Sequence, residues 1–207
     1  MSTPATLTAL SLAATLVAAT GLVAQAQDTS WLDSPLKSWN TPGRALPRAE
    51  PNGETIPELA KRCSYLPVPR NTPGERALAD AGWVPFHLFD KQIVQRDVEI
   101  VGGLAGADGM CRPADFNIFV FVGERFAGTL SPGEMISRED GSVGGGIRLS
   151  EDDVIAAEFS RYLAKDALCC PSGRVRVQYR IDRKSNPPVV VPVSVQPTRQ
   201  VDWRAFC

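Results

Sequence analysis

The strongest pattern of hydrophobic positions in the chain is a pair of apolar runs separated by a short polar turn. Residues 116–122 read FNIFVFV and residues 126–130 read FAGTL, with Gly123-Glu124-Arg125 between them. Two apolar runs joined by a short turn that contains glycine are typical of a β-hairpin. Because the first run is apolar on both faces, we expect it to be a central strand of a sheet that is covered on both sides.

Other segments carry weaker β patterns. Residues 174–181 alternate polar and apolar side chains, which predicts a half-exposed strand. Residues 83–89 and 92–101 are expected to be further strands. Residues 187–197 contain four prolines and predict an extended segment that is at most an edge strand. Residues 154–163 fit either a helix face or a strand, so their pattern leaves both open.

Two short helices are expected before the first strands. Thr72, Pro73 and Glu75 form a favourable helix start, and Gly82 is a suitable stop. A second short helix is expected over residues 56–62. The glycine-rich residues 102–109 predict a mobile loop, and they lack the Lys and Ser/Thr of a phosphate-binding loop. Residues 137–146, also rich in glycine, predict an exposed loop.

The first 26 residues contain no charged side chain and end in Ala24-Gln25-Ala26. This pattern predicts a secretory signal peptide over residues 1–26, with an uncleaved membrane anchor as the alternative. Residues 27–54 are expected to form a proline-rich extended arm, interpreted as a poorly ordered tether with Trp31 and Trp39 as candidate anchors. Residues 55–207 then form a single α+β domain: an antiparallel sheet with one or two short helices, crosslinked by disulfides, and a proline-rich C-terminal extension.

Charge narrows the classes of function. The chain has 22 basic and 23 acidic residues, a formal net charge of −1. Nucleic-acid binding needs a clustered basic surface, so we expect no nucleic-acid partner. The sequence after residue 26 has no second long apolar run, so we expect no membrane span after removal of the signal peptide. We also expect no cofactor and no metal site, because paired Cys-x-x-Cys spacings are absent.

The chain has five cysteines, and export would turn them into structural crosslinks. Neighbouring side chains on an extended backbone point to opposite faces, so Cys169 and Cys170 are better placed to bond two different elements than each other. We therefore expect them to pair with Cys63 and Cys111, in an order that the sequence leaves open. Cys207 is the candidate unpaired cysteine. The alternative is a redox-active vicinal disulfide.

Candidate chemistry outside the cysteines is sparse. His87 is the sole histidine, and with the acidic clusters Glu139-Asp140 and Glu151-Asp152-Asp153 it offers a hydrolase hypothesis. The competing interpretation for His87 is a structural side chain, either on a strand surface or half-buried with its hydrogen bonds satisfied. One face of the strand at residues 174–181 forms a candidate anion- or glycan-binding surface, made of Arg174, Arg176, Gln178 and Arg180.

The segment DALCCPSG at residues 166–173, followed by VRVQYR, resembles the C-terminal signature of the LppP/LprE family of exported bacterial lipoproteins. The strand at residues 119–122 and the segment RFAGT at residues 125–129 are similar too, so the resemblance covers roughly residues 83–182. The chain differs in lacking the acylated cysteine. The resemblance implies a cell-envelope location and favours a strand at residues 154–163, and it implies no reaction.

Together these observations predict a secreted or periplasmic protein that acts as a non-catalytic binding or structural module. Its partner would be a cell-envelope component or a glycan. A hydrolase that uses the loop carboxylates or His87 is one alternative. A thiol-redox protein that uses Cys169 and Cys170 is the other.

Overall fold

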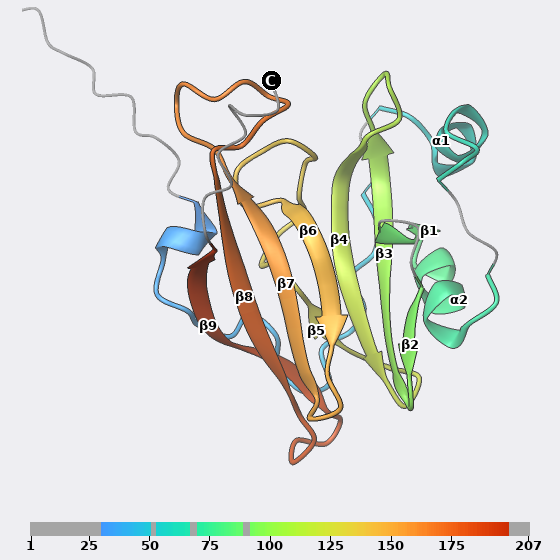
Figure 1. The fold of residues 1–207 in the computed structure, drawn as a ribbon. Helices are drawn as coiled ribbons and strands as arrows, with labels where there is room; N and C mark the ends of the chain where they lie inside the picture. Colours follow the sequence, from blue (N-terminus) through green and yellow to red (C-terminus); the bar gives the residue numbers. More distant parts are fainter. Residues whose placement is uncertain (1–29, 51–52, 67–69, 89–91, 199–207) are drawn as a thin grey trace, which may run out of the picture.

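The computed structural model of the protein describes residues 30–198 except 51–52, 67–69 and 89–91. In this part of the chain, two antiparallel sheets combine with two short helices, α1 (Ile56–Arg62) and α2 (Pro73–Asp80), as Figure 1 shows. A 3-10 turn, η1, covers Trp31–Asp33. The predicted α+β class is confirmed. Both helices lie where the sequence places them, and each begins with a capping box, Thr55 with Glu58 and Thr72 with Glu75.

The first sheet has the strand order β1-β3-β4-β5, and β2 pairs with β3. The predicted hairpin is present as β4 and β5, and β4 lies between two other strands. Residues 116–122 of β4 are all buried, which confirms a central strand covered on both faces. The strands are β1 (Val84–Phe86), β2 (Ile93–Gln95), β3 (Val98–Ala107), β4 (Pro113–Val122) and β5 (Arg125–Thr129).

The prediction of a mobile loop over residues 102–109 is wrong, because β3 continues through this segment to Ala107. Its glycines make room for aromatic rings. A Cβ atom on Gly102 would lie 2.5 Å from the ring of Phe86, and one on Gly103 would lie 2.9 Å from the ring of Phe119. The glycines therefore serve close packing in a strand, a role that composition alone does not distinguish from flexibility.

The second sheet runs in sequence order, β6-β7-β8-β9. Of the ambiguous residues 154–163, residues 154–161 form strand β7, which pairs with β8 as the resemblance implies. The proline-rich tail is the edge strand β9, and the predicted loop over residues 137–146 is wrong from Val143 onward because β6 begins there. The strands are β6 (Val143–Leu149), β7 (Val154–Arg161), β8 (Gly173–Asp182) and β9 (Val189–Thr198).

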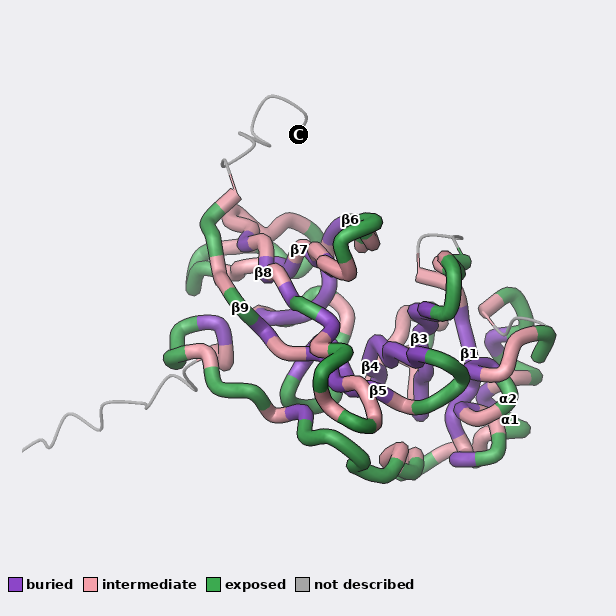
Figure 2. The backbone as a smooth tube through the Cα atoms, turned by 90° about the horizontal axis from the view of Figure 1, so that it is seen from below, coloured by how far each residue is buried: buried purple, intermediate pink, exposed green. Residues whose placement is uncertain are grey.

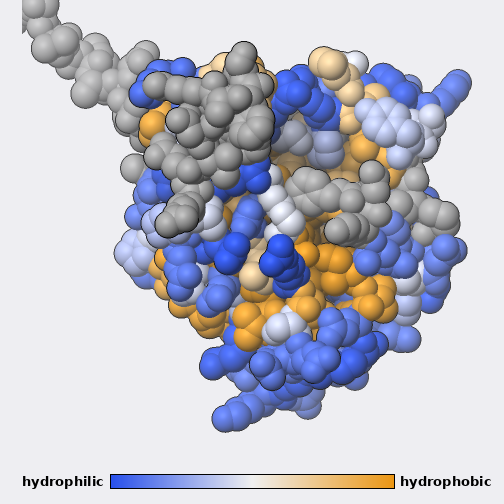
Figure 3. Space-filling model, in the orientation of Figure 1, coloured by the Kyte–Doolittle hydropathy of each residue, from blue (hydrophilic) through white to orange (hydrophobic). Residues whose placement is uncertain are grey.

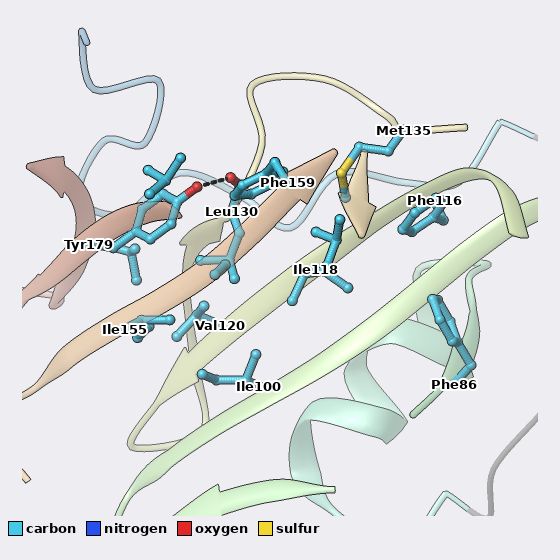
Figure 4. Packing of buried hydrophobic residues seen from close by; sticks show 14 of the residues in the cluster. Phe86, Ile100, Phe116, Ile118, Val120, Leu130, Met135, Ile155, Phe159 and Tyr179 are labelled. Carbon is cyan, nitrogen blue, oxygen red and sulfur yellow. Dashed lines mark hydrogen bonds between the residues drawn. The ribbon is translucent and has the colours of Figure 1, made fainter. Parts of the chain in front are cut away.

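The main core lies between the two sheets. Ile118 and Val120 of the first sheet belong to one buried cluster with Ile155 and Tyr179 of the second (Figure 4). The buried Tyr179 hydroxyl donates a hydrogen bond to the carbonyl of Leu130, so its polar atom is satisfied inside the core. In Figure 2 the buried stretches lie on the strands, whereas exposed stretches lie mainly on the connecting segments. Figure 3 shows apolar side chains reaching the surface between the two sheets.

The two sheets differ in what covers their outer faces. On the first sheet a second cluster packs Leu78 of α2 against Trp83, Phe119 and Phe121, and Leu46 of the arm packs against the same cluster. Figure 1 shows α1 and α2 beside the first sheet, on the side away from the second. On the second sheet the outward positions of β8 are the polar ones, because its buried residues alternate with them.

The arm is anchored, so the tether interpretation is wrong for residues 30–50. The indole nitrogen Nε1 of Trp31 donates to the carbonyl of Gly141, and that of Trp39 donates to the carbonyl of Thr129, each at 3.1 Å. Asn40 is buried; its Nδ2 donates to the carbonyls of Thr129 and Val190, and its Oδ1 accepts from the backbone N–H of Thr129. The arm therefore joins β5 of the first sheet to β9 of the second.

The predicted signal peptide, residues 1–26, and Cys207 lie outside the described residues. Among the residues that are described, no helix is long and apolar enough to cross a bilayer.

Candidate functional site

A pocket of about 450 Å³ lies where residues 40–50 of the arm approach the outer face of the first sheet. Its lining combines aromatic rings with amide and carboxyl groups. The aromatic members are Trp83, Phe119 and Phe126, and the polar members include Asn117, Glu50 and Glu134. This size is within the range of small-molecule sites, which are concave, largely apolar and supplied with a few polar groups.

The aromatic lining is held rigidly by packing and by one hydrogen bond. The ring centroids of Trp83 and Phe119 lie 5.0 Å apart, and those of Phe119 and Phe126 lie 6.1 Å apart. The indole Nε1 of Trp83 donates to the carbonyl of Pro47 in the arm at 2.8 Å. Because Phe119 is an outward residue of the central strand, the same alternation that builds the core also presents a ring to this pocket.

A network around Asn117 fixes the loop that follows β5. The buried amide Nδ2 of Asn117 donates to the carbonyl of Gly133 at 2.8 Å, and its Oδ1 accepts from the hydroxyl of Ser131 at 3.0 Å. The Ser131 hydroxyl also lies 2.6 Å from the carbonyl of Gly133. These contacts position the loop that carries Glu134, so one wall of the pocket is set by side-chain to backbone hydrogen bonds.

The pocket carries excess negative charge. Partial burial raises the pKa of Glu134, and the charges of Asp115 and Glu50 raise it further. Arg44 also lines the pocket, where its guanidinium donates to the carbonyl of Trp39 at 3.1 Å. The site thus offers carboxyl groups beside aromatic faces, a combination that can hold the hydroxyl and C–H groups of a sugar.

His87 directly follows β1, where its side chain reaches Glu75 in the first turn of α2, and it does not line the pocket. Its Nε2 is 2.8 Å from Oε1 of Glu75, whose side chain is only 1% exposed. Burial favours a higher pKa for Glu75, but hydrogen bonds from Thr72, His87 and Asn71 outweigh it and lower the pKa. His87 therefore takes part in capping the helix, which agrees with its interpretation as a half-buried structural histidine.

One carboxylate of each acidic cluster is held in an ion pair. Asp140 accepts from Nε of Arg161 at 3.0 Å, and Asp153 accepts from Arg96 at 2.9 Å and also from Arg183. Hydrogen bonds from Arg183 lower the pKa of Asp153. None of these carboxylates lines the pocket. Within the described ranges, no three His, Cys, Asp or Glu side chains gather as a metal site would require.

On the candidate binding face of the second sheet, two side chains contact other side chains of the protein. Arg176 pairs with Glu158 at 2.6 Å, and Gln178 accepts from the hydroxyl of Ser194 at 3.2 Å. Arg180 is exposed, and Arg174 lies on the same face of β8. A ligand role for Arg174, Arg176, Gln178 and Arg180 stays a prediction.

The cysteine pairing differs from the expected one. Cys63 pairs with Cys111, with Cα atoms 5.4 Å apart, and Cys169 pairs with its neighbour Cys170. The first pair joins the end of α1 to the β3–β4 turn, where Arg62 also donates to the carbonyls of Ala107 and Asp108. Cys169 and Cys170 lie between β7 and β8 of the other sheet. Cys169 and Cys170 do not point to opposite faces as expected, because the loop that carries them is not extended.

Sequence reasoning missed the residues of the pocket. Glu50 lies in the segment that the sequence predicts to be a tether, and Glu134 follows a strand end without any motif around it. One signal was available: residues 116–122 are apolar on both faces, so something had to cover the outer face. The density of Trp and Pro in residues 31–51 indicated a candidate cover.

Comparison with known proteins gives one match. Residues 99–184, from β3 to just beyond β8, match the sequence model of the LppP/LprE lipoprotein family. No curated protein and no solved structure matches the chain. The family indicates an exported or envelope protein. Over this region, which is less than half of the chain, the protein is similar to the LppP/LprE lipoprotein family, in agreement with the resemblance in its sequence.

Proposed function

We propose that the protein is a non-catalytic binding module, secreted or periplasmic, that holds a glycan unit of the cell envelope in the pocket between the arm and the first sheet. The observation that carries this proposal is the lining of the pocket, where Phe126 and Trp83 stand beside Glu50 and Glu134. Sugars present an apolar C–H face and a ring of hydroxyl groups. Aromatic rings accommodate the face, and carboxyl groups accept hydrogen bonds from the hydroxyls.

The rigidity of the site supports a binding role. The Trp83 to Pro47 hydrogen bond and the Asn117 network hold both walls in place before any ligand arrives. A preformed site loses less conformational entropy on binding, so a modest contact area can still give useful affinity. A volume of about 450 Å³ suits one or two sugar rings.

A glycoside hydrolase is the second candidate, and one observation favours it. Two carboxyl groups line the same pocket, and the pKa of one of them, Glu134, is raised by burial and by neighbouring negative charge. A raised pKa is what a general acid needs, and a nearby second carboxylate is what such enzymes pair with it. This candidate uses Glu50 and Glu134 in place of the loop carboxylates and His87.

Calorimetric titration with soluble peptidoglycan fragments tests the proposal. We expect saturable binding, weakened at least tenfold by Phe126→Ala and by Glu134→Gln. The matched control is Glu124→Gln, at the exposed β4–β5 turn, which should bind as the unaltered protein does. Absence of binding, or equal loss in all three variants, would contradict the proposal. Release of new reducing ends, abolished by Glu134→Gln, would favour the hydrolase.

A further inference from the structure

We propose that Cys169 and Cys170 form a reversible thiol–disulfide switch that exchanges electrons with an external dithiol. The starting observation is a contrast between two cysteine pairs. Cys63 and Cys111 are 48 positions apart in sequence, whereas Cys169 and Cys170 are adjacent. A crosslink stabilises a fold mainly by closing a loop in the unfolded chain, and a bond between neighbours closes almost none. The second pair therefore contributes little to holding the fold together.

The vicinal pair is also the more accessible one. Cys169 is exposed, whereas Cys63 is only 1% exposed, and the second cysteine of each pair, Cys170 or Cys111, is half-buried. Two apolar side chains in the same loop are exposed as well, Leu168 at 71% and Leu163 at 54%. Thiol–disulfide exchange requires a thiolate to reach a sulfur atom, so accessibility of Cys169 is the first condition for the switch. The two leucines offer apolar contact to an approaching protein.

The loop between β7 and β8 is built on hydrogen bonds that do not involve the sulfur atoms. The carboxylate of Asp166 accepts from the N–H groups of Leu163 and Ser172 and from the Ser172 hydroxyl, each at 2.8 Å. The hydroxyl of Tyr162 donates to the carbonyl of Leu168 at 3.0 Å. The loop should therefore keep its course after reduction, with both thiols still adjacent and ready to reoxidise.

Atoms and electrons balance in this exchange when the external dithiol is the only co-reactant. One partner thiolate attacks the exposed Sγ of Cys169, and the Cys170 sulfur leaves as a thiolate and takes a proton. The second partner thiolate then attacks the partner sulfur of this mixed disulfide, releasing the Cys169 thiolate, which is protonated in turn. Two electrons and two protons pass to the protein, and the partner is left with a disulfide.

Differential alkylation during a dithiothreitol titration tests the inference. After each step, free thiols are alkylated and located by mass spectrometry of peptides. We expect Cys169 and Cys170 to become alkylated at a dithiothreitol concentration at least tenfold below that required for Cys63 and Cys111, with an unchanged far-ultraviolet circular dichroism spectrum. Simultaneous reduction of both pairs, or a starting bond from either vicinal cysteine to Cys207, would overturn it.

Single variants separate the roles of the two sulfur atoms. In a Cys207→Ser background, which removes the terminal thiol, Cys170→Ser leaves Cys169 alone and Cys169→Ser leaves Cys170 alone. With glutathione disulfide as probe, we expect the Cys169 thiol to form its mixed disulfide several-fold faster than the Cys170 thiol. Equal rates, or a faster Cys170, would contradict attack at the exposed sulfur. Because the loop shares no residue with the pocket, this result is independent of glycan binding.

Discussion

The two sheets of this protein differ in the side chains that their strands carry on the outer face. The first sheet carries aromatic residues outward, among them Phe119 and Phe121, and is covered there by α2 and the arm. The second sheet carries Arg176 and Arg180 outward on β8 and has the usual polar face of an antiparallel sheet. The hydrophobic pattern of a strand therefore indicates whether its outer face is covered, but it does not indicate which segment covers it.

The arm that covers the outer face of the first sheet also helps to form the candidate binding pocket. The arm packs against the sheet through Leu46 and Ala49. Beside these contacts it leaves a pocket, where the indole Nε1 of Trp83 donates a hydrogen bond to the carbonyl of Pro47. The inner faces of both sheets are filled by one continuous core that includes Ile118 and Ile155. The pocket lies where a third layer, the arm, covers a sheet incompletely, on the outer side of the first sheet.

The largest expected effect comes from removing an outward aromatic ring of the first sheet. Phe121→Ala should lower the free energy of unfolding by about 4 kcal/mol, because the ring is 1% exposed and its loss leaves a cavity. Arg180→Ala, on the outer face of the second sheet, should change it by less than about 0.5 kcal/mol. Urea denaturation measures both. Similar losses in the two variants would remove the distinction between the sheets.

A smaller loss is expected at the residue that joins the arm to both sheets. Asn40→Ala should cost about 3 kcal/mol, because it leaves the buried polar backbone groups of Thr129 and Val190 without their side-chain partner. Asn71→Ala is the control, since Asn71 is exposed. Denaturant unfolding followed by tryptophan fluorescence reports the difference. If Asn40→Ala lowers the free energy of unfolding no more than the control does, the arm is not anchored through Asn40 and acts as a tether.

The smallest expected effect concerns an ion-pair network between the sheets at one end. Arg183 pairs with Asp97 in the β2–β3 turn of the first sheet and with Asp153 beside β7 of the second. Hydrogen bonds from Arg183 lower the pKa of both carboxyl groups. Arg183→Gln should cost about 1 kcal/mol at pH 7, a value kept small because the groups are partly exposed to solvent.

The pH dependence of that effect has a definite sign. A carboxyl group whose pKa is lowered by folding stabilises the protein above its unfolded pKa of about 4 and loses this contribution as the pH falls through its folded value. The difference between Arg183→Gln and the unaltered protein should therefore shrink below about pH 4 and vanish in stronger acid. Arg125→Gln, at the exposed start of β5, is the control. A difference that persists in acid would show that Arg183 acts through packing.

Much of the fold follows from local sequence. The capping boxes at Thr55 and Thr72, the apolar run of β4 and the alternation of β8 each depend on neighbouring residues, and each lies where the pattern places it. The site could not be derived in this way. The hydrogen bond from Asn40 to Val190 joins residues 150 positions apart, and no local pattern encodes such a contact.

The cysteines and glycines also have roles that depend on tertiary contacts and not on local sequence. Pairing of Cys63 with Cys111 depends on where α1 lies against the β3–β4 turn, which is a tertiary contact. Gly102 and Gly103 serve as flexible or as closely packed residues according to whether rings such as Phe86 and Phe119 lie above them. Composition reports the residue types, and only the packing decides between the two roles.

On the proposal above, this protein binds its ligand at the outer side of the first sheet, completed by the arm. The most direct measurement is a two-dimensional NMR titration of the labelled protein with a soluble peptidoglycan fragment. We predict saturable shifts of the Trp83 indole N–H and the Phe126 amide, with the amides of Arg176 and Arg180 unmoved. Shifts confined to the arginine face of the second sheet, or no shifts at all, would contradict the account.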